Sequence, residues 1–218
     1  NQDLGGYLNM ARMLRDAGVD VIAHSIRDQD ADAAVIAEIK RRNVGYIATL
    51  TRDLAVFVYE TTPEFLKDPF FLRHVDSYSG DITQLNDPAR QEKVRNSKEA
   101  QAIKQALQHA NRNLKILSDA GVEIALGTDS GTNVGQWQGY FEHTELEMMV
   151  KAGLTPMQAL VAATGGAARV MKLDGKLGTI QAGKKADLLV LNGNPLSDIR
   201  NTRQISSVWI DGRQLATT

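Results

Sequence analysis

The chain has 218 residues, 43% of them hydrophobic, which is enough to bury the core of an ordinary globular protein. Lysine and arginine (25) nearly balance aspartate and glutamate (26), so the charge pattern argues against nucleic acid or an anionic membrane as a partner. Without cysteine there are no disulfides, thiolate metal sites or cysteine nucleophiles, and no apolar run reaches the roughly 20 residues that span a bilayer. We therefore expect a small-molecule substrate.

Three units of helix, turn and strand follow one another in the first 130 residues. The first runs into the strand Val19–His24, the second from the helix Ala33–Arg42 into Tyr46–Thr49, and the third into Glu123–Leu126. Gly18 and its counterpart Gly121 stand where a helix ends in a left-handed cap. The strands are short and apolar, as in a parallel sheet that is covered on both faces. The sequence thus predicts an α/β fold.

A polar segment, residues 51–97, interrupts this pattern after the second strand. It contains several proline turns and is longer than an ordinary connection, and long connections inside compact α/β units are usually functional. Because it follows a strand, we expect it at the carboxyl edge of the sheet, where ligands bind in such folds. We interpret it as a lid, with passive decoration as the alternative.

Beyond Asp129 the pattern becomes helical and then extended. Helices are predicted over 141–152, from Pro156 onward and over 166–172. Strands are predicted at 177–180, 186–191 and 207–210, with Asp211-Gly212 as a hairpin turn. A boundary near Leu173 gives two domains, residues 1–172 and 173–218.

His24 and Asp129 each end a strand of the same predicted sheet, so both should lie at one rim. An imidazole and a carboxylate that meet there can bind a divalent metal such as zinc. The alternatives are a buried histidine bonded to a carbonyl group and an aspartate that stabilises a turn. His143, at the start of the next helix, is within reach of the rim, and its alternative is a solvated side chain.

A larger set of motifs resembles one known family. The matching segments are 21–25, 127–130, 145–146, 152–156, 163–168, 177–180, 182–188, 194–196 and 208–212. Together they cover nearly the whole chain, and they resemble the metal-dependent amidohydrolase superfamily, in its imidazolonepropionase-like and Xaa-Pro dipeptidase-like branch.

The resemblance implies a (β/α)₈ barrel, of which this chain supplies strands six to eight, and part of a small composite β-sandwich. It implies that His24 binds one metal ion, and that Asp129 binds the other and acts as general base and acid. The family's first-strand His-x-His pair, fourth-strand carboxylated lysine and fifth-strand histidine have no counterparts here, and no lysine of this chain substitutes for the bridging one. The resemblance is thus to a C-terminal half.

The resemblance implies hydrolysis of an amide, cyclic amide or peptide-like C–N bond, with zinc as the expected metal. Arg52 and Tyr140, placed after the seventh and eighth strands, are candidates for contacting substrate, as is His143. Open sheet edges should be covered by the missing N-terminal half or by self-association. We expect the isolated chain to be inactive, and the alternative function is a catalytically silent assembly module. The compartment is unknown, with the cytoplasm favoured.

Overall fold

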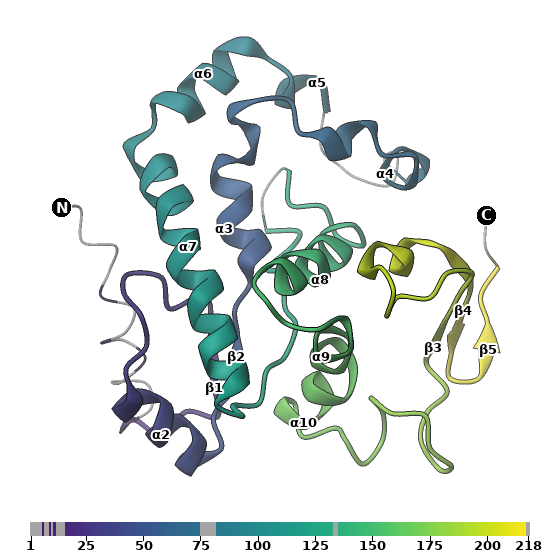
Figure 1. The fold of residues 1–218 in the computed structure, drawn as a ribbon. Helices are drawn as coiled ribbons and strands as arrows, with labels where there is room; N and C mark the ends of the chain where they lie inside the picture. Colours follow the sequence, from purple (N-terminus) through teal and green to yellow (C-terminus); the bar gives the residue numbers. More distant parts are fainter. Residues whose placement is uncertain are drawn as a thin grey trace.

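The computed structural model describes Gly6, Asn9, Ala11 and residues 16–74, 82–132 and 135–216, except for the side chains of His74 and Thr83. It has a mixed α/β fold: a small parallel sheet with helices packed against it, followed by a helical run and a separate antiparallel sheet (Figure 1). No helix in the described ranges is long and apolar enough to cross a membrane.

The parallel sheet consists of β1 (Val21–Ala23), β2 (Gly45–Ile47) and one further bridge. β1 pairs with β2 in parallel, with Ile22 opposite Tyr46, and Tyr46 forms a parallel bridge to Ile124. The three predicted strands are therefore neighbours and run in the same direction. Their carboxyl ends meet at one edge of the sheet, which we call the carboxyl edge.

The helices of this part begin and end where the sequence provides caps. Helix α2 (Ala33–Arg42) has the predicted bounds, with the Asp32 side chain accepting a hydrogen bond at its start and Asn43 left-handed at its end. Helix α7 (Lys98–Asp119) ends before Gly121, which has a φ of 78°. The main core lies between these helices and the sheet, and its centre includes Val35, Ile39, Tyr46, Leu114 and Leu117.

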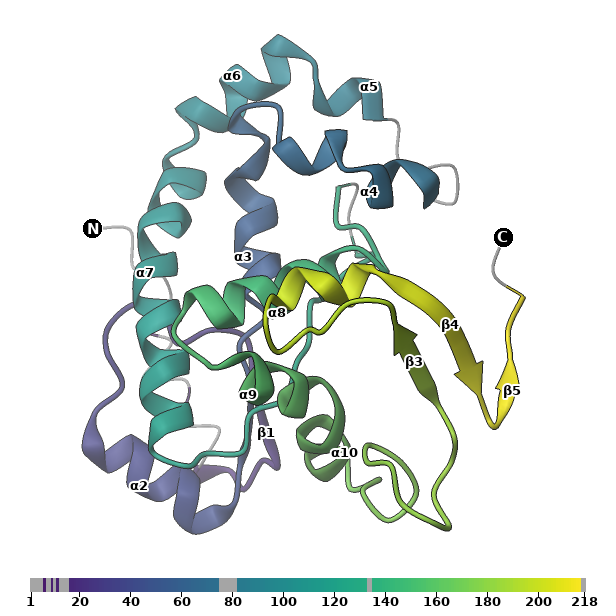
Figure 2. The ribbon, with the colours of Figure 1, turned by 45° about the vertical axis from the view of Figure 1, so that its right-hand side comes forward.

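The described residues between 51 and 97, predicted as a polar insertion, are largely helical. They begin inside α3 (Leu50–Phe57), which packs along α7. The remaining elements are η1 (Val58–Glu60), η2 (Glu64–Lys67), α4 (Pro69–His74), α5 (Ile82–Leu85) and α6 (Pro88–Asn96). In Figures 1 and 2, α5 and α6 lie at the far end of α3, away from the parallel sheet, and α4 lies to the right of the upper part of α3.

A helical segment with one short break at residues 152–155 follows the parallel sheet. It consists of α8 (Phe141–Lys151), α9 (Pro156–Val161), the π-helical turn η4 (Ala162–Gly166) and α10 (Ala167–Val170). Thr155 and Gln158 form a reciprocal capping box at the start of α9, which begins at Pro156 as predicted. The carbonyl group of Ala162 accepts a 2.9 Å hydrogen bond from the Leu126 amide, which ties the π-helical turn to the third strand segment.

The C-terminal part forms an antiparallel sheet of β3 (Leu188–Leu191), β4 (Ile205–Ile210) and β5 (Arg213–Gln214), with the helix η5 (Ile199–Arg203) before β4. The predicted turn is confirmed, since Asp211 and Gly212 both have positive φ between β4 and β5. The predicted strand at 177–180 is wrong: this segment consists of bends, and Ile180 is 90% exposed. It pairs with no strand among the described residues, so its apolar pattern alone does not make it extended sheet.

Candidate functional site

Each of the three parallel strand segments is followed by a residue in the left-handed backbone region. These residues are His24, Thr49 and Asp129, with φ values of 72°, 51° and 58°. Such a backbone is uncommon outside glycine and is costly for β-branched threonine, so strain of this kind is typical of sites that hold side chains in a set position. The carboxyl edge is therefore the strained region of this sheet.

The imidazole of His24 is held by the neighbouring strand. Its Nδ1 lies 2.8 Å from Oγ1 of Thr49, and the next residue, Ser25, donates a 2.8 Å hydrogen bond to the carbonyl oxygen of Ala48. In the tautomer that carries its proton on Nδ1, His24 donates to Thr49 and presents the lone pair of Nε2. A histidine oriented through one ring nitrogen is the usual form of a metal ligand.

Asp129 lies in a loop that closely approaches the neighbouring strand. A Cβ on Gly127 would lie 2.6 Å from Cγ2 of Ile47, so only glycine fits there. The Thr128 hydroxyl accepts from the Ser130 amide at 3.2 Å and donates to Oε1 of Glu142 at 3.1 Å. The Asp129 side chain itself is exposed. The loop thus holds a solvent-accessible carboxylate at the carboxyl edge.

Sequence reasoning did not identify Glu145 as a component of this site. It lies on α8 and is only 1% exposed. Its two carboxylate oxygens accept hydrogen bonds from the amides of Leu50 and Thr51 at 2.8 and 2.7 Å, and the Thr51 hydroxyl lies 2.7 Å from Oε2. Burial, opposed by these donors, raises the pKa of Glu145 to about 7.

Arg52 lies in the first turn of α3 rather than on a loop as predicted. Its guanidinium lies 3.2 Å from Oδ1 of Asp53 and its side chain is one-third exposed. Asp53 is fully buried and also pairs with the buried Arg27. Burial raises the pKa of the Asp53 carboxyl, and the two arginines oppose this shift. Arg52 therefore helps to neutralise a buried carboxylate.

Tyr140 and His143 lie at the start of α8 and are held by other parts of the chain. The Tyr140 hydroxyl donates a 2.9 Å hydrogen bond to Oδ2 of Asp68, and burial raises its pKa. Nδ1 of His143 lies 2.9 Å from Oγ1 of Thr202, and its ring packs edge-on against Phe70. Burial lowers the pKa of His143 to about 4, so it is neutral at pH 7. Both side chains are held by contacts within the chain, and their predicted contact with substrate stays a prediction.

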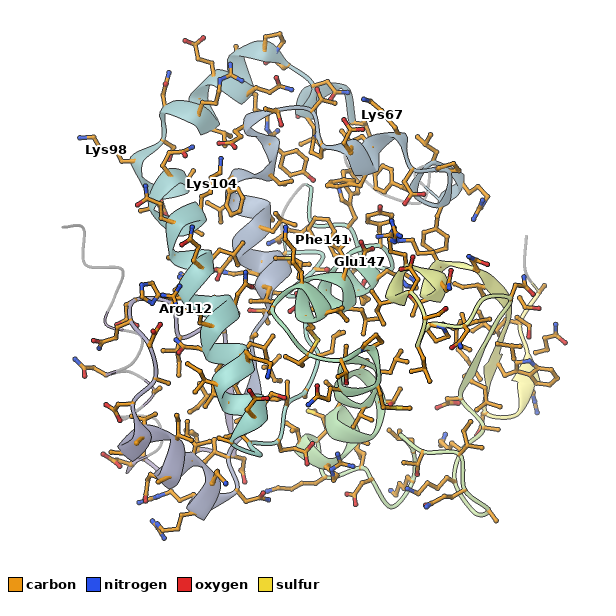
Figure 3. All side chains as sticks on the ribbon, in the orientation of Figure 1. Lys67, Lys98, Lys104, Arg112, Phe141 and Glu147 are labelled. Carbon is orange, nitrogen blue, oxygen red and sulfur yellow. The ribbon has the colours of Figure 1, made fainter. Side chains whose placement is uncertain are left out.

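Arg203 joins the three parts of the chain that meet beside these residues. Its guanidinium lies 3.3 Å from Asp68, pairs with Glu147 and stacks over the ring of Tyr140 at 4.9 Å. Figure 3 shows Glu147 on α8 near η5, and it shows Lys67, Lys98 and Lys104 on the outer helical segments. Within the described ranges, no three histidine, aspartate or glutamate side chains are grouped closely enough to hold a metal ion.

Comparison with known proteins assigns the family. The model of the amidohydrolase family matches residues 7–215. The ochratoxinase of Aspergillus niger is 36% identical over 124 residues, which are 53% of this chain and 24% of that protein. The imidazolonepropionase of Deinococcus radiodurans is 35% identical over 103 residues, which are 45% of this chain and 25% of that protein.

A solved structure of a Xaa-Pro dipeptidase with bound methionine has a similar fold, with a TM-score of 0.67 and 24% identity over 96% of this chain and 43% of the dipeptidase. The chain thus spans less than half the length of each of these three proteins. The family match covers nearly all of its residues, and the chain therefore belongs to the amidohydrolase family.

Proposed function

We propose that this chain is the C-terminal half of a metal-dependent hydrolase that cleaves a C–N bond in a small molecule. The observation that carries the proposal is the carboxyl edge, where an oriented imidazole and an accessible carboxylate follow parallel strand segments on either side of β2. Neighbouring strands are about 4.8 Å apart, so β1 and the strand segment at Ile124 are separated by roughly 10 Å. Two side chains that follow these segments can bridge such a distance through an ion.

His24 and Asp129 fit a divalent metal in the kind of donors they offer. Imidazole nitrogen and carboxylate oxygen are both ligands of zinc, and Nε2 of His24 is the ring nitrogen left available by the contact with Thr49. Two donors are fewer than the four of a zinc site, so the remaining ligands have to come from outside the described residues. When bound, the ion would supply Lewis acidity and lower the pKa of water at the site.

The roles of the chain's own residues follow from their positions. Thr49 holds the His24 imidazole in one orientation, so no conformational entropy has to be lost when Nε2 binds a metal ion. Asp129 acts as general base toward the attacking water, and the same carboxylic acid then returns the proton to the leaving nitrogen. Its exposure allows it to reach both atoms without breaking an internal contact.

The remainder of the catalytic barrel and of the composite sandwich would come from elsewhere. We propose that residues 1–172 form strands six to eight of a (β/α)₈ barrel and that residues 173–218 belong to a second, composite domain. Ala23 is exposed on β1, and in the described part of the chain β1 pairs with β2 alone, which leaves an edge for another strand. The missing N-terminal half would cover this edge, and a second copy of the chain is the alternative.

A catalytically silent assembly module is the alternative function. It is favoured for the isolated chain by the small number of metal donors within the described residues. Metal analysis distinguishes the hydrolase from the silent module: the complete site should retain one or two divalent ions per subunit, and a silent module none.

The substitution Asp129→Asn tests the chemical role. In the assembled enzyme it should abolish hydrolysis of acyl-proline dipeptides or cyclic amides, since the amide can neither accept nor return the proton. Thermal unfolding should change little because the side chain is exposed. Retained turnover in a correctly folded Asp129→Asn variant would contradict the proposed mechanism.

A further inference from the structure

We propose that Glu145 is a positioning residue that holds the His24 and Asp129 loops in register through the single turn Thr49–Thr51. This inference rests on the proposed function, because it concerns how the two proposed ligand loops are kept together. It follows from contacts that join α8, the start of α3 and the two other strand ends.

The start of α3 has no local cap. Thr49 occupies the cap position with a φ of 51°, and its side chain makes no capping hydrogen bond. The first amides of a helix have no partner inside the helix, and they need one when they are buried. Glu145 supplies it from 94 residues away along the chain, with one carboxylate oxygen on each of the first two amides of α3.

The same turn touches both proposed ligand loops. Oγ1 of Thr49 lies 2.8 Å from Nδ1 of His24. Oγ1 of Thr51 lies 3.3 Å from the carbonyl oxygen of Thr128, the residue before Asp129, and 2.7 Å from the carboxylate of Glu145. A displacement of the turn would therefore move the contacts of His24 and of the Asp129 loop together.

Glu145 is buried at a free-energy cost, so packing alone does not explain a carboxylate at this position. Glu145 is 1% exposed and no cation pairs with it within the described residues; its partners are two amides and one hydroxyl. A buried carboxylate without a counter-ion costs free energy that an apolar side chain of similar size would avoid. By contrast, Glu147 on the same helix is partly exposed and pairs with Arg203.

Hydrogen exchange measured by mass spectrometry tests the proposal without a metal or a substrate. Glu145→Gln replaces one of the two carboxylate oxygens with an NH₂ group. This group cannot accept a hydrogen bond, so one of the two amides of Leu50 and Thr51 loses its acceptor. We expect exchange to increase at least tenfold in peptides that contain residues 50–51 and, together with them, in peptides that contain 24–26 and 127–130. An increase confined to residues 50–51 would show a local helix cap and overturn the proposal.

Glu147→Gln is the matched control on the same helix. It should increase exchange near η5 through the loss of the Arg203 pair, and it should leave 24–26 and 127–130 unchanged. If Glu145→Gln fails to fold, Thr51→Val removes only the hydroxyl group. This variant should increase exchange at 127–130 and leave 24–26 unchanged, and unchanged exchange at 127–130 would refute the link.

Zinc titration of the assembled protein against a chelator extends the test to the site. Loss of a direct outer contact to a metal ligand typically weakens binding about 10- to 100-fold. Glu145 acts on the ligand loops only through the turn Thr49–Thr51, so we expect a loss at the lower end, about tenfold, for Glu145→Gln and none for Glu147→Gln. Wild-type affinity in a folded Glu145→Gln variant would contradict the proposal. If the wild-type protein binds no zinc, the proposed function fails, and the exchange experiment alone decides on the role of Glu145.

Discussion

The pH dependence of stability should contain two opposing contributions from α8. The pKa of Glu145 rises from 4.5 to about 7 on folding, whereas that of His143 falls from 6.5 to about 4. Between pH 4.5 and 7 the unfolded chain has lost the Glu145 proton that the folded state keeps, so this group makes stability fall as the pH rises. Between pH 4 and 6.5 the unfolded chain binds a proton on His143 that the folded state excludes, so stability rises with pH.

The two contributions are of similar size. Each shift of about 2.5 pH units corresponds to about 3 kcal/mol at 1.36 kcal/mol per unit, and the windows overlap between pH 4.5 and 6.5. The wild-type protein should therefore show a shallow dependence there, since the slopes oppose each other. Asp53, whose pKa is also raised, adds to the falling slope.

Removing one titrating group should reveal the pH dependence that the other contributes. Glu145→Gln cannot titrate and lacks the wild type's fall in stability, so the free energy of unfolding of the variant minus that of the wild type should increase by about 3 kcal/mol from pH 4.5 to pH 7. The lost contacts of Glu145 add a cost that does not change with pH. His143→Gln should change in the opposite sense between pH 4 and 6.5. Urea unfolding at constant ionic strength measures both curves, and curves parallel to that of the wild type would refute the assignment of these shifts to burial.

Three further substitutions, with one control, test packing and ion pairing elsewhere in the chain. Tyr46→Phe removes the hydroxyl that accepts a 3.0 Å hydrogen bond from the buried Ile26 amide, and urea unfolding should show a loss of about 1–3 kcal/mol. Gly166→Ala would place a Cβ 2.5 Å from the Ile124 carbonyl oxygen and should cost a similar amount, whereas Gly175→Ala, with nothing within 4 Å, should be nearly neutral. Arg203→Met leaves Asp68 and Glu147 without their shared cation and should lower the melting temperature by several degrees; an unchanged melting temperature would show that the pair contributes little.

Local signals account for most of the correct predictions about the fold. The bounds of the helix 33–42 follow from a capping aspartate before it and an asparagine after it. The Asp211-Gly212 hairpin turn follows from two residues that tolerate positive φ. The parallel neighbours β1 and β2 were predicted from repeated helix-to-strand units, because such units place successive strands side by side.

The errors arise where long-range contacts decide the structure. The segment 177–180 has an apolar pattern but no strand partner in the described part of the chain. The predicted insertion 51–97 contains short helices among its described residues, which its polar composition did not predict. Residues 145–146 are among the segments that resemble the family, but the contacts of Glu145 have no local signal, since its partners lie 94 and 95 residues away. His24 and Asp129 were predicted as site residues because both follow strands, whereas Thr49 could be recognised only from its backbone angle and its contact with His24.

The central claim is that His24 and Asp129 are ligands in one metal site. Anomalous diffraction from crystals of the assembled protein grown with zinc tests it most directly. We predict a zinc peak about 2.0–2.2 Å from Nε2 of His24, and zinc at the same carboxyl edge about 2.0–2.2 Å from a carboxylate oxygen of Asp129. Zinc bound only at other residues, or no zinc at this edge in a folded and fully assembled protein, would contradict the account.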